Sequence, residues 1–228
     1  MVLFDGPRAV GEARAHGLSL PALSPELSGL SEFIVADPKF PKEPRWIPQA
    51  RLRRSHVPAE LLPWLLISSS LTRRLRRHSG GRLHLRVLDQ AWVYPEPSEK
   101  QALGMRSGER ALVRQVQMSG NGVPWVFART VIPARSLCGP QRRLARLGSK
   151  PLGAVLFTDK SMRRGELELA VLVPGQHLFD LAVRDLPETP DRIWGRRSLF
   201  WLGNRPLLVC EIFLPGLLAG SRQPHSES

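Results

Sequence analysis

The chain has 228 residues, of which 42% are hydrophobic and 23% are charged. This composition excludes a collagen, a coiled coil and a fully disordered chain, and the length favours one domain with an extension over two full domains. The net charge of +13 points to anionic partners, either phosphates or small carboxylates.

The two ends of the chain differ in composition from its middle. Residues 1–45 are rich in Pro, Gly, Ser and Ala, and three prolines fall between Asp37 and Pro44. We predict a mobile N-terminal extension here, because these prolines prevent a helix and little apolar surface is available for burial. The folded domain is predicted to span residues 46–216, with a C-terminal tail at 217–228.

The positive charge is concentrated in the predicted domain, where residues 46–216 contain 27 basic and 13 acidic side chains. Residues 166–191 depart from this pattern, with six acidic residues and one basic residue. We predict that the segment 174–191 is an inserted, acidic surface loop.

Neither a membrane span nor a secretion signal is visible. No apolar run is long enough to cross a bilayer, and the N-terminus lacks a basic start followed by an apolar run. Cys138 and Cys210 are 72 positions apart, which is not a metal-type spacing, and two thiols would be a sparse disulfide framework. We expect a cytoplasmic protein with both cysteines reduced.

In chain order, the first predicted elements are helices. The run from Pro58 to Ile67 is typical of a short buried helix. A second helix is predicted from Arg73 to His78, capped by the Ser- and Thr-containing segment 68–72 and ended by the glycines at 80–81.

After these glycines the hydrophobic period changes to two, which indicates strands. The first strand is predicted at 82–94. Hairpins follow at 111–118 with 124–132, where Asn121-Gly122 suits a tight turn, and at 198–202 with 206–214. Short helical segments are predicted at 140–147 and 151–157. Strands in runs with grouped helices predict an α+β fold with one antiparallel sheet flanked by helices.

Two charged residues stand in otherwise apolar strand faces. Arg114 alternates with Leu112 and Val116, and Glu211 lies in a strand that is apolar on both faces. A buried salt bridge between the two explains this pattern about as well as a pocket in which Arg114 binds a carboxylate and Glu211 faces a hydroxyl or a mobile proton. Arg129 is either a neighbour that supports Glu211 or a surface arginine.

Other motifs are weak. The six histidines show no metal-ligand spacing, and no phosphate loop or dinucleotide fingerprint occurs, so we expect no metal and no cofactor. A basic helix face is either solvated, able to receive RNA or able to steer an anion. It contains no aromatic side chains of the kind that nucleic-acid surfaces interleave with their basic residues. This face consists of Arg73, Arg74, Arg76 and Arg77.

Three segments together resemble one known family. They are Trp125-Val-Phe-Ala-Arg-Thr-Val-Ile-Pro133, Leu147-Gly-Ser-Lys-Pro-Leu-Gly-Ala-Val-Leu-Phe-Thr158, and Ile193-Trp-Gly-Arg-Arg-Ser198 followed by Pro206-Leu-Leu-Val-Cys-Glu-Ile-Phe-Leu-Pro215. Their order and spacing are similar to those of chorismate pyruvate-lyase, a bacterial enzyme of ubiquinone synthesis, from about Trp46 to Pro215.

The resemblance implies a fold, an activity and a site. The expected fold encloses a ligand cavity beneath helical flaps, and the expected reaction is the cofactor-independent conversion of chorismate to 4-hydroxybenzoate and pyruvate. Arg114 would bind the ring carboxylate and Glu211 would face the ring hydroxyl, with main-chain groups at Leu71 and Leu152 completing the site. Leu71 replaces the methionine that is common in the family, a change that keeps the backbone amide.

The family is mostly monomeric, which sets the same expectation here, with no nucleic-acid partner. The 44-residue N-terminal extension and the acidic insertion are not typical of the family. A ligand-sensing module of the related effector-domain fold is the alternative function, although no helix-turn-helix segment precedes this domain.

Overall fold

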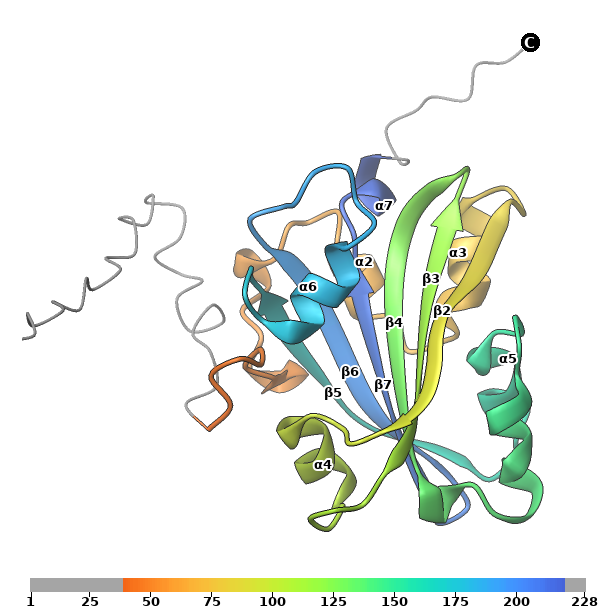
Figure 1. Ribbon diagram of the computed structural model, residues 1–228. Coiled ribbons are helices and arrows are strands. Elements are labelled where there is room, and N and C mark those ends of the chain that lie inside the picture. Colours follow the sequence, from red (N-terminus) through yellow and green to blue (C-terminus); the bar gives the residue numbers. More distant parts are fainter. Residues whose placement is uncertain (1–38, 220–228) are drawn as a thin grey trace, which may run out of the picture.

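The computed structural model describes residues 39–219, in which an antiparallel sheet carries helices on both faces (Figure 1). The spatial order of the strands is β1-β5-β6-β7-β4-β3-β2. The strands are β1 (Ile47–Pro48), β2 (Leu83–Val93), β3 (Ala111–Gly120), β4 (Val123–Pro133), β5 (Met162–Leu172), β6 (Ile193–Leu202) and β7 (Arg205–Phe213). The α-helices are α2 (Leu62–Leu65), α3 (Leu71–His78), α4 (Pro97–Leu103), α5 (Leu152–Leu156), α6 (His177–Val183) and α7 (Gly216–Ala219). The 3-10 helices are η2 (Gln49–Arg51), η3 (Arg54–His56), η4 (Ala134–Ser136) and η5 (Gly139–Arg146).

Both predicted hairpins are confirmed, and they form the centre of the sheet. Asn121 and Gly122 have φ values of 52° and 81°, so the β3–β4 turn uses the left-handed region that Asn-Gly favours. Strands β6 and β7 form the second hairpin. Pairing of β4 with β7 joins the two hairpins and places Ala128 opposite Glu211. The α+β class with a single antiparallel sheet is therefore confirmed.

The predicted helices are present with altered bounds. Ser70 caps α3 by accepting a hydrogen bond from the Arg73 amide at 3.4 Å, and the chain leaves the helix through glycines with positive φ. The first predicted helix is helical only over α2, and the segment predicted at 140–147 is the 3-10 helix η5 rather than an α-helix.

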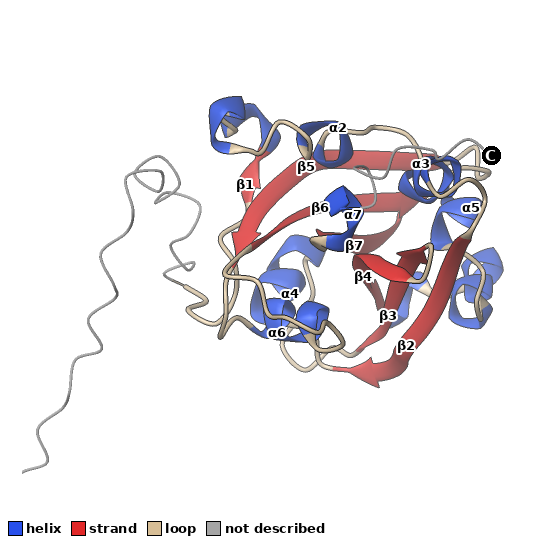
Figure 2. Cartoon of the chain, turned by 90° about the horizontal axis from the view of Figure 1, so that it is seen from above, coloured by secondary structure: helices blue, strands red, loops and turns tan. Residues whose placement is uncertain are grey.

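The helices divide between the two faces of the sheet (Figure 2). On the face that carries Arg114, Val116, Arg196 and Glu211, here called the site face, α2 and α3 pack in one apolar cluster and α5 packs in another. On the opposite face, α6 packs against Phe127 and Ile212, and α4 packs against Val113 and Cys210. Strands β3, β4, β6 and β7 are therefore largely buried on both faces.

The predicted domain limits need correction where the structure describes them. Glu43 lies before the predicted boundary at Trp46, yet it is 7% exposed and accepts hydrogen bonds from the backbone and side chain of Ser98. At the other end, Leu217 is fully buried in α7, so the predicted tail begins too early. Residues 1–38 and 220–228 lie outside the described residues.

The prediction of a surface loop at 174–191 is wrong for its first half. This segment contains α6, which buries Phe179, Ala182 and Val183 against the sheet. Its acidic side chains lie on the exposed side of the helix and in the following loop. The acidic composition of the whole segment therefore predicts a surface loop, although three of its apolar residues are buried in a helix.

Arg129 does not support Glu211. It points to the opposite face of the sheet, where its Nε and Nη2 donate to the Glu99 carboxylate at 2.7 and 3.0 Å. Burial alone would lower the pKa of Arg129, but the hydrogen bonds and the charge of Glu99 outweigh it and raise that pKa. The pair is 5% and 6% exposed and fixes α4 to the sheet.

Replacing Arg129 with methionine should lower the free energy of unfolding by about 3–5 kcal/mol, because the Glu99 carboxylate would stay buried without its cation. Urea unfolding followed by circular dichroism measures this loss. A second variant that adds Glu99→Gln removes the stranded charge and should recover part of the stability. Unchanged unfolding of the single variant would contradict a stabilising role for the pair.

Candidate functional site

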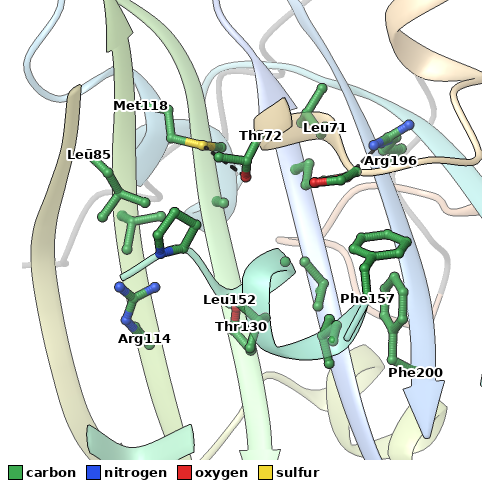
Figure 3. Close-up of a pocket in the computed structure, with 18 of the residues that line it drawn as sticks. Leu71, Thr72, Leu85, Arg114, Met118, Thr130, Leu152, Phe157, Arg196 and Phe200 are labelled. Atoms are coloured by element: carbon green, nitrogen blue, oxygen red, sulfur yellow. Dashed lines mark hydrogen bonds and ion pairs between the residues drawn. The ribbon is translucent and has the colours of Figure 1, made fainter. Parts of the chain in front are cut away.

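A pocket opens on the site face between the strands and the beginnings of α3 and α5 (Figure 3). Its volume, measured as the space open to the centre of a water molecule, is about 60 Å³. The strands supply Arg114, Val116, Met118, Ala128, Thr130, Arg164, Arg196, Phe200, Val209 and Glu211. The helical segments supply Ser70, Leu71, Thr72, Pro151, Leu152, Gly153, Leu156 and Phe157. We call this the site pocket.

Arg114 brings an uncompensated positive charge to the site pocket. The residue is 3% exposed, and its Nη2 donates to the carbonyl oxygens of Gly148 at 2.8 Å and Lys150 at 3.3 Å. Its Nε is buried and has no hydrogen-bond partner in the part of the chain that the structure describes. Burial lowers the pKa of Arg114. The guanidinium is therefore held in place with donor capacity left for an anion.

The other buried arginines of residues 39–219 show how unusual this arrangement is. Arg129, Arg196 and Arg197 each contact a carboxylate, from Glu99, Glu211 and Glu168 respectively. Arg114 contacts main-chain carbonyl groups instead. Since a buried charge is costly without a counter-charge, the structure favours an anionic ligand at Arg114.

Glu211 is paired, but with Arg196 and not with Arg114. Arg196 Nε donates to Glu211 Oε2 at 2.6 Å, and Arg196 Nη1 donates to the carbonyl oxygens of Trp64, Leu65 and Ile67 at 2.9–3.0 Å. These bonds fix the guanidinium, which in turn fixes the carboxylate. The Glu211 side chain keeps 18% of its surface exposed, so its second oxygen can accept a hydrogen bond from a ligand.

Arg164 is a second cation without a carboxylate hydrogen-bond partner in the described structure. Its Nε donates to Ser198 Oγ at 3.2 Å and its Nη1 to the carbonyl oxygen of Ser68 at 3.1 Å. Burial and then the nearby charge of Arg196 lower the pKa of Arg164, while Glu211 acts in the other direction. Three guanidinium groups and one carboxylate line the site pocket, which gives it a formal charge of +2.

Leu71 and Leu152 are the first residues of α3 and α5, and both line the site pocket. Amide groups in the first turn of a helix have no partner within the helix, so they are available to a ligand. Thr72 ties α3 to the sheet, because its hydroxyl donates to Met118 Sδ at 3.9 Å (Figure 3).

The structure thus brings four of the five predicted site residues to one pocket: Arg114, Glu211, Leu71 and Leu152. Arg129 is excluded from it. Two residues that the sequence analysis did not assign are Arg196 and Arg164. Arg196 alternates with Trp194, Ser198 and Phe200 as Arg114 does with its neighbours, and this pattern could have revealed it.

Within residues 39–219, no cluster of three or more His, Cys, Asp or Glu side chains is arranged to hold a metal ion. In the same part of the chain, no helix has the length and apolar character that crossing a membrane requires.

The chain is similar to one protein family over most of its length. Residues 41–222 match the model of a family described as "Chorismate lyase". A "Probable chorismate pyruvate-lyase" of Methylococcus capsulatus is 44% identical over 156 residues, covering 68% of this chain and 95% of that protein. The "Chorismate pyruvate-lyase" of Cronobacter sakazakii is 34% identical over 161 residues, covering 71% and 84%.

Solved structures resemble the chain less closely. The ligand-binding domain of a GntR-family transcriptional regulator from Bordetella bronchiseptica aligns with a TM-score of 0.44 and 19% identity, covering 59% of this chain and 86% of that domain. At this TM-score the likeness carries no argument about function.

Proposed function

We propose that this chain, which belongs to the chorismate lyase family, converts chorismate to 4-hydroxybenzoate and pyruvate, the first step of ubiquinone synthesis. The observation that carries the site assignment is the buried Arg114 guanidinium, which lacks a carboxylate partner within residues 39–219 and faces the same pocket as Glu211. A cytoplasmic location stays a prediction from the sequence, and a monomeric state stays a prediction from the family resemblance.

In this proposal Arg114 binds the ring carboxylate. Its geometry supports this role, because the bonds to Gly148 and Lys150 leave donors for an anion. The amide groups of Leu71 and Leu152 add donors from the helical side of the pocket. A guanidinium and amide donors together give a carboxylate the charge-assisted bonds that bind it most strongly.

Glu211 takes the other end of the ring. Arg114 is opposite Thr130 and Glu211 is opposite Ala128, so their Cα atoms are separated by two strand spacings, about 10 Å in total, and by a shift of two residues along the strands. A para-substituted benzene ring fits between them with its carboxylate toward Arg114. The hydroxyl group can then donate to the free oxygen of Glu211.

Arg164 is proposed to bind the carboxylate of the enolpyruvyl group. Chorismate carries two carboxylates, and the site pocket carries a formal charge of +2. Within residues 39–219, no carboxylate forms a hydrogen bond with the guanidinium group of Arg114 or of Arg164. The dianion therefore balances the charge of the pocket.

The reaction itself needs positioning more than covalent help. The bond between the ring carbon and the enolpyruvyl oxygen breaks, and the neighbouring carbon, which bears the hydroxyl, loses its hydrogen as the ring becomes aromatic. That proton ends on the methyl carbon of pyruvate, so atoms and electrons balance without an oxidant or another reactant. If the pocket fixes both the ring and the carboxylate of the enolpyruvyl group, chorismate is held in the geometry from which elimination occurs. This positioning is the main source of the rate enhancement that such a site can provide.

Incubating the purified chain with chorismate tests the proposal. We expect 4-hydroxybenzoate and pyruvate to appear in equal amounts, measured by chromatography and by a coupled pyruvate assay. A chain that consumes no chorismate, or that releases one product without the other, would overturn the proposed function.

Arg114→Ala should weaken the binding of chorismate and of 4-hydroxybenzoate alike, by about 10- to 100-fold, because charge-assisted bonds to a carboxylate shared by both ligands are lost. Steady-state KM and equilibrium titration with 4-hydroxybenzoate measure the two effects. Arg163→Ala, which removes an exposed arginine outside the site pocket, is the control. A loss of affinity for only one ligand would contradict the assignment.

Glu211→Gln should reduce kcat about 100-fold while changing the affinity for 4-hydroxybenzoate about threefold or less, because an amide keeps the contact but not the charge. Glu168→Gln is a matched control, since Glu168 forms a similar pair with Arg197 at 2.7 Å on the opposite face. It should share any loss of thermal stability and retain turnover. Equal losses of turnover and affinity in Glu211→Gln would refute the role of Glu211.

Arg164→Gln should raise the KM for chorismate about tenfold or more and leave the affinity for 4-hydroxybenzoate nearly unchanged, because only chorismate has the second carboxylate. The ratio of the two effects is the measurement. If both ligands lose affinity equally, Arg164 does not contact the enolpyruvyl group.

A further inference from the structure

Strand β5 is irregular beside the site pocket, where it pairs with β6 (Figure 1). Arg164 is opposite Phe200 and Leu167 is opposite Ser198, so three steps along β5 match two steps along β6. One extra residue in one of two paired strands is a β-bulge, a feature that often redirects a side chain. Residues 165–166 lie within this shift, and we call them the β5 bulge.

The β5 bulge decides which face of the sheet receives Arg164. In a regular strand, residues three positions apart point to opposite faces. Here Arg164 and Leu167 both point to the site face, because Arg164 lines the site pocket and Leu167 packs in the apolar cluster of α2 and α3. Regular pairing continued from Leu167 would place Arg164 opposite Trp201, on the other face of the sheet. The site pocket would then lose one of its cations.

Both residues of the bulge face away from the site pocket. Gly165 and Glu166 line a hollow on the opposite face, together with Leu199 and Trp201. The Glu166 side chain is exposed. The extra residue therefore reaches solvent and displaces no packed core.

Gly165 is the position at which the bulge tolerates no side chain. A side-chain carbon here would lie 3.0 and 3.1 Å from Cζ3 and Cη2 of Trp201, and 3.5 Å from Cβ of Leu199. Carbon atoms in contact are normally about 3.5–4.0 Å apart, so a larger residue pushes against the indole ring and the strand must shift. Trp201 is opposite Arg163, the residue before Arg164. A shift at Gly165 therefore reaches Arg164 through one peptide unit on either side.

The contacts of Arg164 depend on the register that the bulge produces. Its Nε donates to Ser198 Oγ at 3.2 Å, and its guanidinium carbon lies 5.3 Å from the centre of the Phe200 ring. Both partners point to the site face of β6. Arg164 reaches them because it is opposite Phe200 and not opposite Trp201.

We propose that Gly165 is a positioning residue for substrate selectivity, which directs Arg164 into the site pocket through the β5 bulge. There Arg164 binds the carboxylate that chorismate carries and 4-hydroxybenzoate lacks. This rests on the proposed function, because it takes the role of Arg164 from it. Gly165 lines the opposite face of the sheet and acts on the ligand only through Arg164.

Gly165→Val in the full chain tests the proposal, because the methyl groups of valine collide with Trp201. We expect the KM for chorismate to rise about tenfold and the Kd for 4-hydroxybenzoate to change less than about twofold. Steady-state kinetics and equilibrium titration measure the two values. A substitution that merely loosened the sheet would weaken both ligands, so the readout is the ratio of the two changes.

A double-mutant cycle shows whether Gly165 acts through Arg164. In the Arg164→Gln background, Gly165→Val should raise the KM for chorismate less than about twofold, because the guanidinium that it displaces is already absent. Glu166→Ala is the matched control. It changes the exposed residue of the same bulge without a collision, and it should change both values less than about twofold.

Gly165→Ala is a milder variant, for which the neighbouring atoms must give by a few tenths of an ångström. It should show the same selectivity with a smaller rise in KM. If circular dichroism shows that Gly165→Val does not fold, Gly165→Ala decides in its place.

An unchanged KM for chorismate in the folded variant, equal losses for both ligands, or an equal effect in the Arg164→Gln background would each overturn the positioning role. These results leave the proposed function intact, because turnover by the unsubstituted chain is measured separately. If that chain forms no 4-hydroxybenzoate and pyruvate from chorismate, the proposed function fails and the role of Gly165 fails with it.

Discussion

The guanidinium of Arg114 is kept out of water without being neutralised by the described protein. Main-chain oxygens of Gly148 and Lys150 orient it, but they offer only partial charges. Removing a cation from water costs several kcal/mol unless a full counter-charge replaces the solvent. An anionic ligand removes this cost when it binds, so the stability of the bound state and selectivity for a carboxylate have the same physical origin.

The sheet separates this charge from those that hold the fold together. Arg196 and Arg197 are neighbours in β6, and the alternation of a strand sends them to opposite faces. Arg197 binds Glu168 and the hydroxyl of Ser98, which fixes α4, whereas Arg196 binds Glu211 inside the site pocket. The same residue pair, Arg with Glu, therefore stabilises the scaffold on one face and, on the other, fixes the carboxylate that is proposed to bind the ligand.

Local chemistry in the sequence predicts much of this arrangement. Period-two alternation and the Asn121-Gly122 turn identify β3 and β4, and the alternation singles out Arg114. The location of Arg129 depends on the register of β4 against β7, a contact between segments about 80 residues apart that no local pattern encodes. Helix α4 is not among the elements predicted from the sequence. Its start does carry a local signal, because Pro97 lies in the first turn and Glu96 and Glu99 form a capping box.

The site pocket has a floor and a roof of different stability. The floor consists mainly of β3, β4, β7 and β6, which are paired on both sides and whose backbone hydrogen bonds and two-sided cores resist opening. The roof consists of α3, which buries Leu71 and Leu75, and α5, which buries only Leu156. Local opening costs least where few side chains are buried. In the proposed function the ligand therefore enters through the roof, while the floor holds Arg114 and Glu211 in place.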